Sequence, residues 1–138
     1  MTPRESIPVA ILCGGRGTRL RGDGPSPPKP LVEIGGRPIL WHVIRLYAAQ
    51  GFRRFLLLTG YRGEDIAAFA GTTQWGPGVD VRCVDTGEDT ASGGRLHRAA
   101  ELLGDGTSCV TYADGLADID LHRLVDFHHA HGAPATVT

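Results

Sequence analysis

Short apolar runs alternate along the chain with longer segments in which apolar residues recur every three to four positions. The apolar runs occupy residues 9–13, 55–59, 79–84, 108–112 and 135–138. Runs of this length and composition are typical of buried strands, whereas the longer periodic segments are typical of amphipathic helices. The alternation therefore predicts an α/β fold.

Three of the periodic segments carry clear helix signals. They are predicted as helices over residues 38–50, 94–103 and 120–131. The first has Pro38 in its opening turn and Gly51 directly after it, and both residues favour a helix between them. The other two are followed by Gly104 and Gly132. Each segment is apolar on one face, so we expect the helices to pack against the sheet.

A ligand is expected at the carboxyl ends of the predicted strands, as in other open α/β sheets. The loops after Cys13, Thr59, Val84 and Tyr112 are therefore the candidate site. A chain of 138 residues with 41% hydrophobic content can bury one core, and it contains no repeat, linker or low-complexity segment. Residues 1–138 are accordingly predicted to form a single domain.

The loop after the first predicted strand carries the most informative motif, LCGGRGTRL at residues 12–20, with Lys29 shortly beyond it. Glycines lack a Cβ and let backbone N–H groups approach and point at an anion. Arg16, Arg19 and Lys29 add positive charges that suit a triphosphate. The segment therefore predicts a nucleotide-phosphate site.

Two better-known glycine motifs do not fit. A P-loop requires Lys-Ser/Thr after its last glycine, but Gly17 is followed by Thr18 and Arg19. A dinucleotide fingerprint requires a third glycine where this chain has Leu20. For this segment alone, a tight turn with solvent-exposed arginines is the alternative, and Lys29 favours phosphate binding over it.

Acidic residues follow the predicted strand that ends at Tyr112. Asp114 is well placed to hold Mg²⁺ beside a phosphate site, with a simple turn as its alternative role. For Asp118 and Asp120, capping of the next helix or solvation is the favoured interpretation. The loop at residues 85–95 offers hydroxyls, paired glycines and an arginine, which can contact a base, a ribose or a phosphate.

Charge and cysteine content limit the function classes. Fourteen basic and fifteen acidic residues give a net charge of −1, which argues against nucleic acid and a polybasic membrane contact as partners. The three cysteines lie in or at the end of apolar runs without CxxC spacing, so we expect reduced, buried thiols. The chain has no apolar signal region or membrane-span pattern. We therefore expect a cytoplasmic protein.

Several segments, in this order and spacing, resemble the sugar-1-phosphate nucleotidylyltransferases, and most of all the glucose-1-phosphate cytidylyltransferase branch. They are PVAILCGGRGTRL (8–20), PKPLVEIGGRPILWH (28–42), GYRG (60–63), VDTG (84–87), GGRL (93–96), TYADGLAD (111–118) and DFHHAHG (126–132). The resemblance covers nearly the whole chain. It implies a Rossmann-like, open, mostly parallel sheet with helices on both faces.

The resemblance also implies roles for individual residues. Catalytic roles fall to Arg19, Lys29 and Asp114, with Lys29 at the α-phosphate and Asp114 holding Mg²⁺. The implied nucleotide-binding residues are Leu12, Cys13, Gly14, Gly15, Arg16, Gly17, Thr18, Arg19, Lys29, Thr90, Gly94, Arg95 and Ala113. The implied substrates are CTP, or another nucleoside triphosphate, and glucose 1-phosphate, or another sugar 1-phosphate. The implied products are CDP-glucose and pyrophosphate, formed by a homo-oligomer.

The chain departs from the family pattern in three respects, one of which is the loop at residues 21–28, where Pro28 stands in place of a common second lysine. Family members are longer, and their C-terminal half supplies a second metal-binding aspartate and most of the sugar pocket. Three interpretations remain open: a truncated enzyme, an enzyme complemented by another subunit, and a nucleotide-binding module without chemistry of its own. Ala113 also replaces a glycine at a place where the backbone approaches the ligand, and its methyl group is expected to weaken binding.

Overall fold

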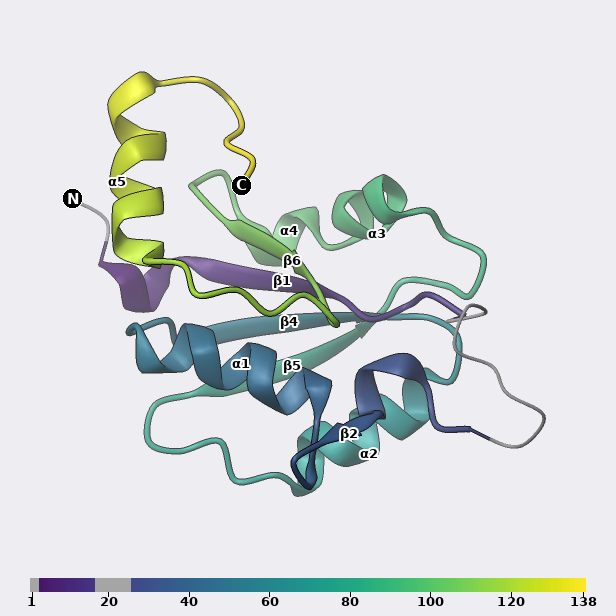
Figure 1. Cartoon of the computed structure of the whole chain (residues 1–138). Helices are drawn as coiled ribbons and strands as arrows, with labels where there is room; N and C mark the ends of the chain where they lie inside the picture. Colours follow the sequence, from purple (N-terminus) through teal and green to yellow (C-terminus); the bar gives the residue numbers. More distant parts are fainter. Residues whose placement is uncertain (1–2, 17–25) are drawn as a thin grey trace.

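The computed structural model describes residues 3–16 and 26–138, which form a four-stranded sheet flanked by helices (Figure 1). The strands are β1 (Pro8–Leu12), β4 (Arg54–Thr59), β5 (Asp80–Asp85) and β6 (Cys109–Tyr112). They lie in the order β5-β4-β1-β6, and every neighbouring pair is parallel. β1 is central, so the motif that follows it emerges from the middle of the sheet.

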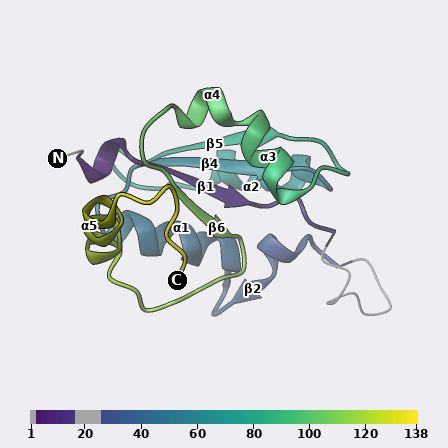
Figure 2. The same ribbon diagram turned by 90° about the horizontal axis from the view of Figure 1, so that it is seen from above.

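The remaining elements connect these strands. The helices are α1 (Ile39–Ala49), α2 (Gly63–Thr72), α3 (Ser92–Arg98), α4 (Ala100–Leu103) and α5 (Leu121–His131). The described residues also contain the 3₁₀ turns η1 (Arg4–Ser6) and η3 (Lys29–Leu31) and a small hairpin of β2 (Glu33–Ile34) and β3 (Arg37–Pro38). α3 and α4 cover one face of the sheet, and α1 and α5 lie against the other (Figure 2).

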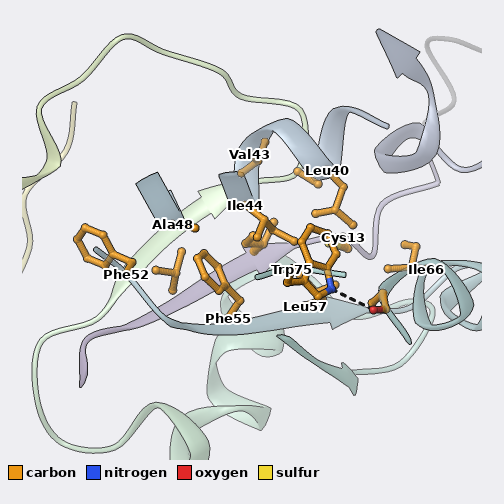
Figure 3. Close-up of a cluster of buried hydrophobic side chains, with 14 of the residues drawn as sticks. Cys13, Leu40, Val43, Ile44, Ala48, Phe52, Phe55, Leu57, Ile66 and Trp75 are labelled. Carbon is orange, nitrogen blue, oxygen red and sulfur yellow. Dashed lines mark hydrogen bonds between the residues drawn. The ribbon is translucent and has the colours of Figure 1, made fainter. Parts of the chain in front are cut away.

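The larger hydrophobic cluster lies between the sheet and α1 (Figure 3). Leu40, Val43 and Ile44 of α1 point toward Phe55 and Leu57 of β4, and all five side chains are at most 1% exposed. Successive residues of a strand point to opposite faces of the sheet. Leu56 and Leu58, which follow Phe55 and Leu57 in β4, therefore belong to the cluster on the other face. That second cluster contains Ala10, Leu56, Leu58 and Ala99, and Leu96 and Leu103 pack on it.

The predicted α/β fold with a parallel sheet and helices on both faces is confirmed. Four of the five predicted strands and all three predicted helices are present, within a few residues of the expected ends. The second predicted helix begins at Ser92 and breaks at Ala99 into α3 and α4. Helix α2 was not predicted.

The predicted strand at residues 135–138 is wrong. The segment has no strand in the structure, and Val137 is 91% exposed. Thr136 is instead held by α5, where its hydroxyl lies 2.9 Å from His128 Nδ1 and 2.7 Å from His131 Nε2. A short apolar alternation becomes a strand only when a neighbouring strand supplies its hydrogen bonds, and within the described residues no strand pairs with this segment.

No helix among the described residues combines the length and the apolar character needed to cross a bilayer.

The buried thiols of Cys13 and Cys109 are expected to lower the free energy of unfolding at high pH. Burial raises the pKa of the Cys109 thiol to about 11 and also raises the pKa of Cys13. In the unfolded chain these thiols ionise near a pKa of about 8.5, so the stability is fully present below that pH. We expect the free energy of unfolding to fall from about pH 8.5 to about pH 11, by at most about 1.4 kcal/mol per pH unit for each thiol.

Urea unfolding at pH 8, 9, 10 and 10.5 measures this loss. Cys109→Ala is the matched variant and is expected to reduce the slope. The remaining slope reports Cys13 and Cys83 and, at the highest pH, Tyr47, because burial raises the pKa of each of these groups. An unfolding free energy that is flat over this range would contradict the burial of the thiols.

Candidate functional site

Four loops meet at one edge of the sheet because all four strands end there. The register pairs Leu12 of β1 with Leu58 and with Tyr112, and pairs Thr59 with Asp85 (Figure 1). Residues 13–16, 60–62, 86–91 and 113–118 therefore leave the sheet from neighbouring positions. The loops predicted to form the site are the ones that the fold brings together.

A close polar contact at this edge joins two of the predicted catalytic residues. Lys29 Nζ lies 2.5 Å from Asp114 Oδ2, and the two side chains are 35% and 37% exposed. The turn η3 holds Lys29 in place, because Pro28 and Pro30 on either side are both buried. Asp114 lies just after β6, so the pair joins a loop that follows β1 in the chain to the end of β6. Both groups are accessible to a ligand.

Asp114 has the chemistry of a Mg²⁺ ligand. Mg²⁺ is commonly held by one or two carboxylates together with substrate phosphates and water. The described part of the chain contains no group of three or more His, Cys, Asp or Glu side chains that could form an all-protein metal site. The residues present therefore fit a Mg²⁺ ion whose coordination is completed by the oxygens of a bound triphosphate.

Arg16 links the loop after β1 to the loop after β5. Its Nη2 atom lies 2.8 Å from Glu88 Oε1 and 2.9 Å from Asp89 Oδ1, and its guanidinium lies over the ring of Tyr61, 5.5 Å from the centroid. The hydrogen bond to Asp89 and the charge of Glu88 raise the pKa of Arg16. A phosphate that binds Arg16 competes with these carboxylates in a solvent-exposed setting, where such ion pairs are weak.

Arg95 is held differently, because it is only 5% exposed. Its Nη1 atom donates to Thr59 O (3.1 Å), Thr86 Oγ1 (2.8 Å) and Gly87 O (2.7 Å). Its Nη2 atom donates to Gly14 O (3.1 Å) and Glu88 O (3.3 Å). Burial lowers the pKa of Arg95, and the nearby charge of Arg98 lowers it further.

Glycines make the room that Arg95 occupies. A Cβ built on Gly14 would overlap the guanidinium carbon of Arg95, and one on Gly60 would lie 2.6 Å from Arg95 Nη1. Gly15 differs, since a Cβ there would meet no described atom within 4 Å. Gly14 and Gly60 therefore serve internal packing, and Gly15 faces open space.

Two further nucleotide-binding candidates at the strand ends, Cys13 and Ala113, are buried. Cys13 and Ala113 are 2% and 4% exposed and belong to the larger core cluster. Their N–H groups extend the sheet by donating to Leu58 O and Leu12 O. The methyl group of Ala113 therefore points into the core, which locates it away from the exposed side of the loop.

Thr90 and Gly94 lie where α3 begins. A Cβ on Gly94 would come within 2.9 Å of Thr90 Cγ2, so the glycine lets the Thr90 side chain pack on the first turns of this helix. Both residues are half-buried. The remaining candidates, Gly17, Thr18 and Arg19, lie outside the described residues.

Two features of the site escaped the sequence interpretation. Thr86 is fully buried, and its hydroxyl donates to Thr59 O at 2.8 Å while accepting from Arg95. Glu88 and Asp89 are the partners of Arg16. A threonine at a strand end followed by glycine was a visible signal for Thr86, but the pairing of Arg16 needs the three-dimensional arrangement.

Comparisons with known proteins agree with this geometry. Residues 9–138 match the family described as nucleotidyl transferase. The chain is 39% identical over 149 residues to the probable glucose-1-phosphate cytidylyltransferase of Bacillus subtilis. It is 38% identical over 155 residues to the glucose-1-phosphate cytidylyltransferase of Salmonella typhimurium. Each alignment covers 94% of this chain and 59% of the relative, so the chain spans about three fifths of the length of these relatives.

A solved structure shows the same fold. HddC from Yersinia pseudotuberculosis, crystallised in complex with GMP-PN, superposes with a TM-score of 0.77 at 25% identity. The superposition covers 88% of this chain and 54% of HddC.

Proposed function

The chain belongs to the nucleotidyl transferase family, and on that premise we propose that it transfers a nucleotidyl group from a nucleoside triphosphate to a sugar 1-phosphate. The products are a nucleoside diphosphate sugar and pyrophosphate. We further propose CTP and glucose 1-phosphate as the substrates, because the relatives at 38% and 39% identity are named for that pair.

The observation that carries the proposal is the contact between Lys29 and Asp114 at the carboxyl edge of the sheet. The proposed cation for the α-phosphate and the proposed carboxylate for Mg²⁺ lie side by side. In this arrangement Lys29 exchanges its carboxylate partner for the α-phosphate when the nucleotide binds. Asp114 is then available to the metal ion.

The reaction needs no protein base. A sugar phosphate has a second pKa near 6, so at pH 7 it is already largely a dianion. Its oxygen forms a bond to the α-phosphorus as the bond from that phosphorus to the bridging oxygen of pyrophosphate breaks, and the electron pair leaves with pyrophosphate. The protein has to align two anions and neutralise their charge.

The described residues divide that task. Lys29 is proposed to lower the repulsion at the α-phosphate and Arg16 to bind the outer phosphates, after each gives up its carboxylate partner. Asp114 would hold Mg²⁺, which when bound neutralises phosphate charge and favours the departure of pyrophosphate. Arg19 has the same proposed role as Arg16 and lies outside the described residues.

A nucleotide-binding module that needs another chain for activity is the second candidate. It concerns residues 1–138, which align with 59% of the length of the two cytidylyltransferase relatives. The partner in this case would be a further polypeptide or a second copy in a homo-oligomer. This candidate predicts nucleotide binding without turnover.

One assay panel separates the two candidates. The purified chain is incubated with Mg²⁺, each of four nucleoside triphosphates and several sugar 1-phosphates, and pyrophosphate release is measured beside the melting temperature. Transfer is expected with CTP and glucose 1-phosphate. Binding alone would raise the free energy of unfolding by about 2.7 kcal/mol at a nucleotide concentration a hundred times Kd. Neither pyrophosphate nor stabilisation with any nucleotide would refute both candidates.

A further inference from the structure

Both Nη nitrogens of the Arg95 guanidinium are engaged by the protein itself. The two Nη nitrogens carry four hydrogens, and they face five oxygens of the described residues. Those oxygens come from the ends of β1, β4 and β5 and from the loops that follow them. Neither Nη nitrogen has a hydrogen left to aim at a phosphate or a base.

We propose that Arg95 is a positioning residue, which fixes the backbone of the strand-end loops that bind the nucleotide and does not touch the nucleotide itself. The inference rests on the proposed nucleotide-binding function of this edge. It departs from the direct contact that the family resemblance implies for Arg95.

Peptide geometry explains how Arg95 sets the direction of the binding groups. In a planar trans peptide the C=O and the following N–H point in opposite directions. Because Arg95 binds the carbonyls of Gly14, Gly87 and Glu88, it directs the N–H groups of Gly15, Glu88 and Asp89 away from the guanidinium. Gly15 and Glu88 are exposed, so these donors point toward the open side of the loops.

The arrangement also places the positive charge of Arg95 on the buried side of the loops that follow β1 and β5. Among residues 3–16 and 26–138, no carboxylate lies within ion-pair distance of Arg95. Five neutral oxygens solvate the charge, and it is screened less by water than a surface charge would be. An anion held on the far side of the Gly14 and Gly87 peptides is attracted by this charge without contact.

The packing at this point accepts no substitute for the guanidinium. The space next to Gly14 and Gly60 fits a flat group that can donate in several directions. A lysine has its three donors on one nitrogen, so it lacks the second nitrogen that in Arg95 binds Gly14 O and Glu88 O. The positioning role therefore depends on the two Nη nitrogens of Arg95 as well as on its charge.

The test compares Arg95→Ala, Arg95→Lys and Thr86→Val with Arg82→Ala, a matched loss of an exposed arginine on β5. Hydrogen exchange of the hydrogen-bonded amides of Cys13, Thr86 and Gly87 is measured without nucleotide, and CTP affinity is measured by titration with Mg²⁺. Exchange is expected to rise at least about tenfold in the first three variants, with CTP affinity falling by a similar factor. Arg82→Ala is expected to match the wild type in both.

Thr86→Val keeps the arginine and its charge, and it removes only the hydroxyl that joins Arg95 to Thr59. It decides the question if Arg95→Ala fails to fold. Unchanged exchange together with a loss of CTP affinity in Arg95→Ala would show direct contact and overturn the inference. A wild-type chain that binds no nucleotide would refute the proposed function, while the exchange rates would still decide whether Arg95 holds the loops.

Discussion

Asp114→Asn is expected to slow Mg²⁺-dependent pyrophosphate release from CTP and glucose 1-phosphate by about a hundredfold or more, on the order of 3 kcal/mol. The substitution keeps the size of the side chain and removes the charge that would hold Mg²⁺. If the chain binds nucleotide without turnover, the corresponding result is the loss of the Mg²⁺-dependent part of nucleotide affinity. Both readouts are measured over a Mg²⁺ titration.

The effect on stability is expected to be small, which separates the chemical role from the structural one. The side chains of Lys29 and Asp114 are each about one third exposed, so their ion pair is screened by solvent. Such pairs contribute on the order of 1 kcal/mol or less. The melting temperature of Asp114→Asn should therefore lie within a few degrees of the wild type.

Asp118→Asn is the matched control, because Asp118 is an exposed acid in the same loop and its substitution changes the net charge equally. It is expected to retain the wild-type rate and Mg²⁺ dependence. Lys29→Met is expected to lose a similar factor of a hundred, by weaker alignment of the α-phosphate. Near-wild-type rates in Asp114→Asn or Lys29→Met would refute the assigned roles.

The sheet was predictable because strand residues buried on both faces form continuous apolar runs, as in residues 55–59. Helix α2 was not predicted, since its start has acidic residues in the first turn, Glu64 and Asp65, but no capping side chain before them. The residue before it, Arg62, has a left-handed backbone with φ of 52° and makes no side-chain cap bond. By contrast, Asp120 does cap α5 by accepting from the Arg123 N–H at 3.0 Å, and Gly132 ends that helix with φ of 67°. A capping aspartate and a terminal glycine can both be recognised in the sequence, so this helix was predictable.

The site was predictable as far as the strand-end rule extends. That rule brought residues 12–16, Lys29 and Asp114 to one edge, and the structure places Lys29 against Asp114 there. The rule says nothing about burial of individual side chains. Arginines are mostly exposed in proteins, so a sequence suggests a ligand contact for Arg95, whereas tertiary packing buries it among carbonyl oxygens. The same packing gives Gly14 a structural reason to be glycine.

Gly14→Ala is expected to destabilise the chain by about 3 kcal/mol, because the new Cβ would overlap the guanidinium of Arg95. Arg95 must then move and give up hydrogen bonds to several buried oxygens, each of which loses stability when left without a donor. For a chain of this length the expected fall in melting temperature is about 10 °C. Urea and thermal unfolding both measure it.

Gly15→Ala is the neighbouring control that makes the measurement specific to this contact. A Cβ on Gly15 meets no described atom within 4 Å, so the free energy of unfolding should change by no more than about 0.5 kcal/mol. The methyl group would instead occupy the open side of the loop, where a phosphate is proposed to approach the backbone, and CTP affinity should fall at unchanged stability. The two variants thus separate the inner side of the loop, which packs on Arg95, from the outer side, which is proposed to bind the nucleotide. Equal stability of Gly14→Ala and Gly15→Ala would contradict the packing of Arg95 described here, and undiminished CTP affinity in Gly15→Ala would contradict the proposed position of the phosphate.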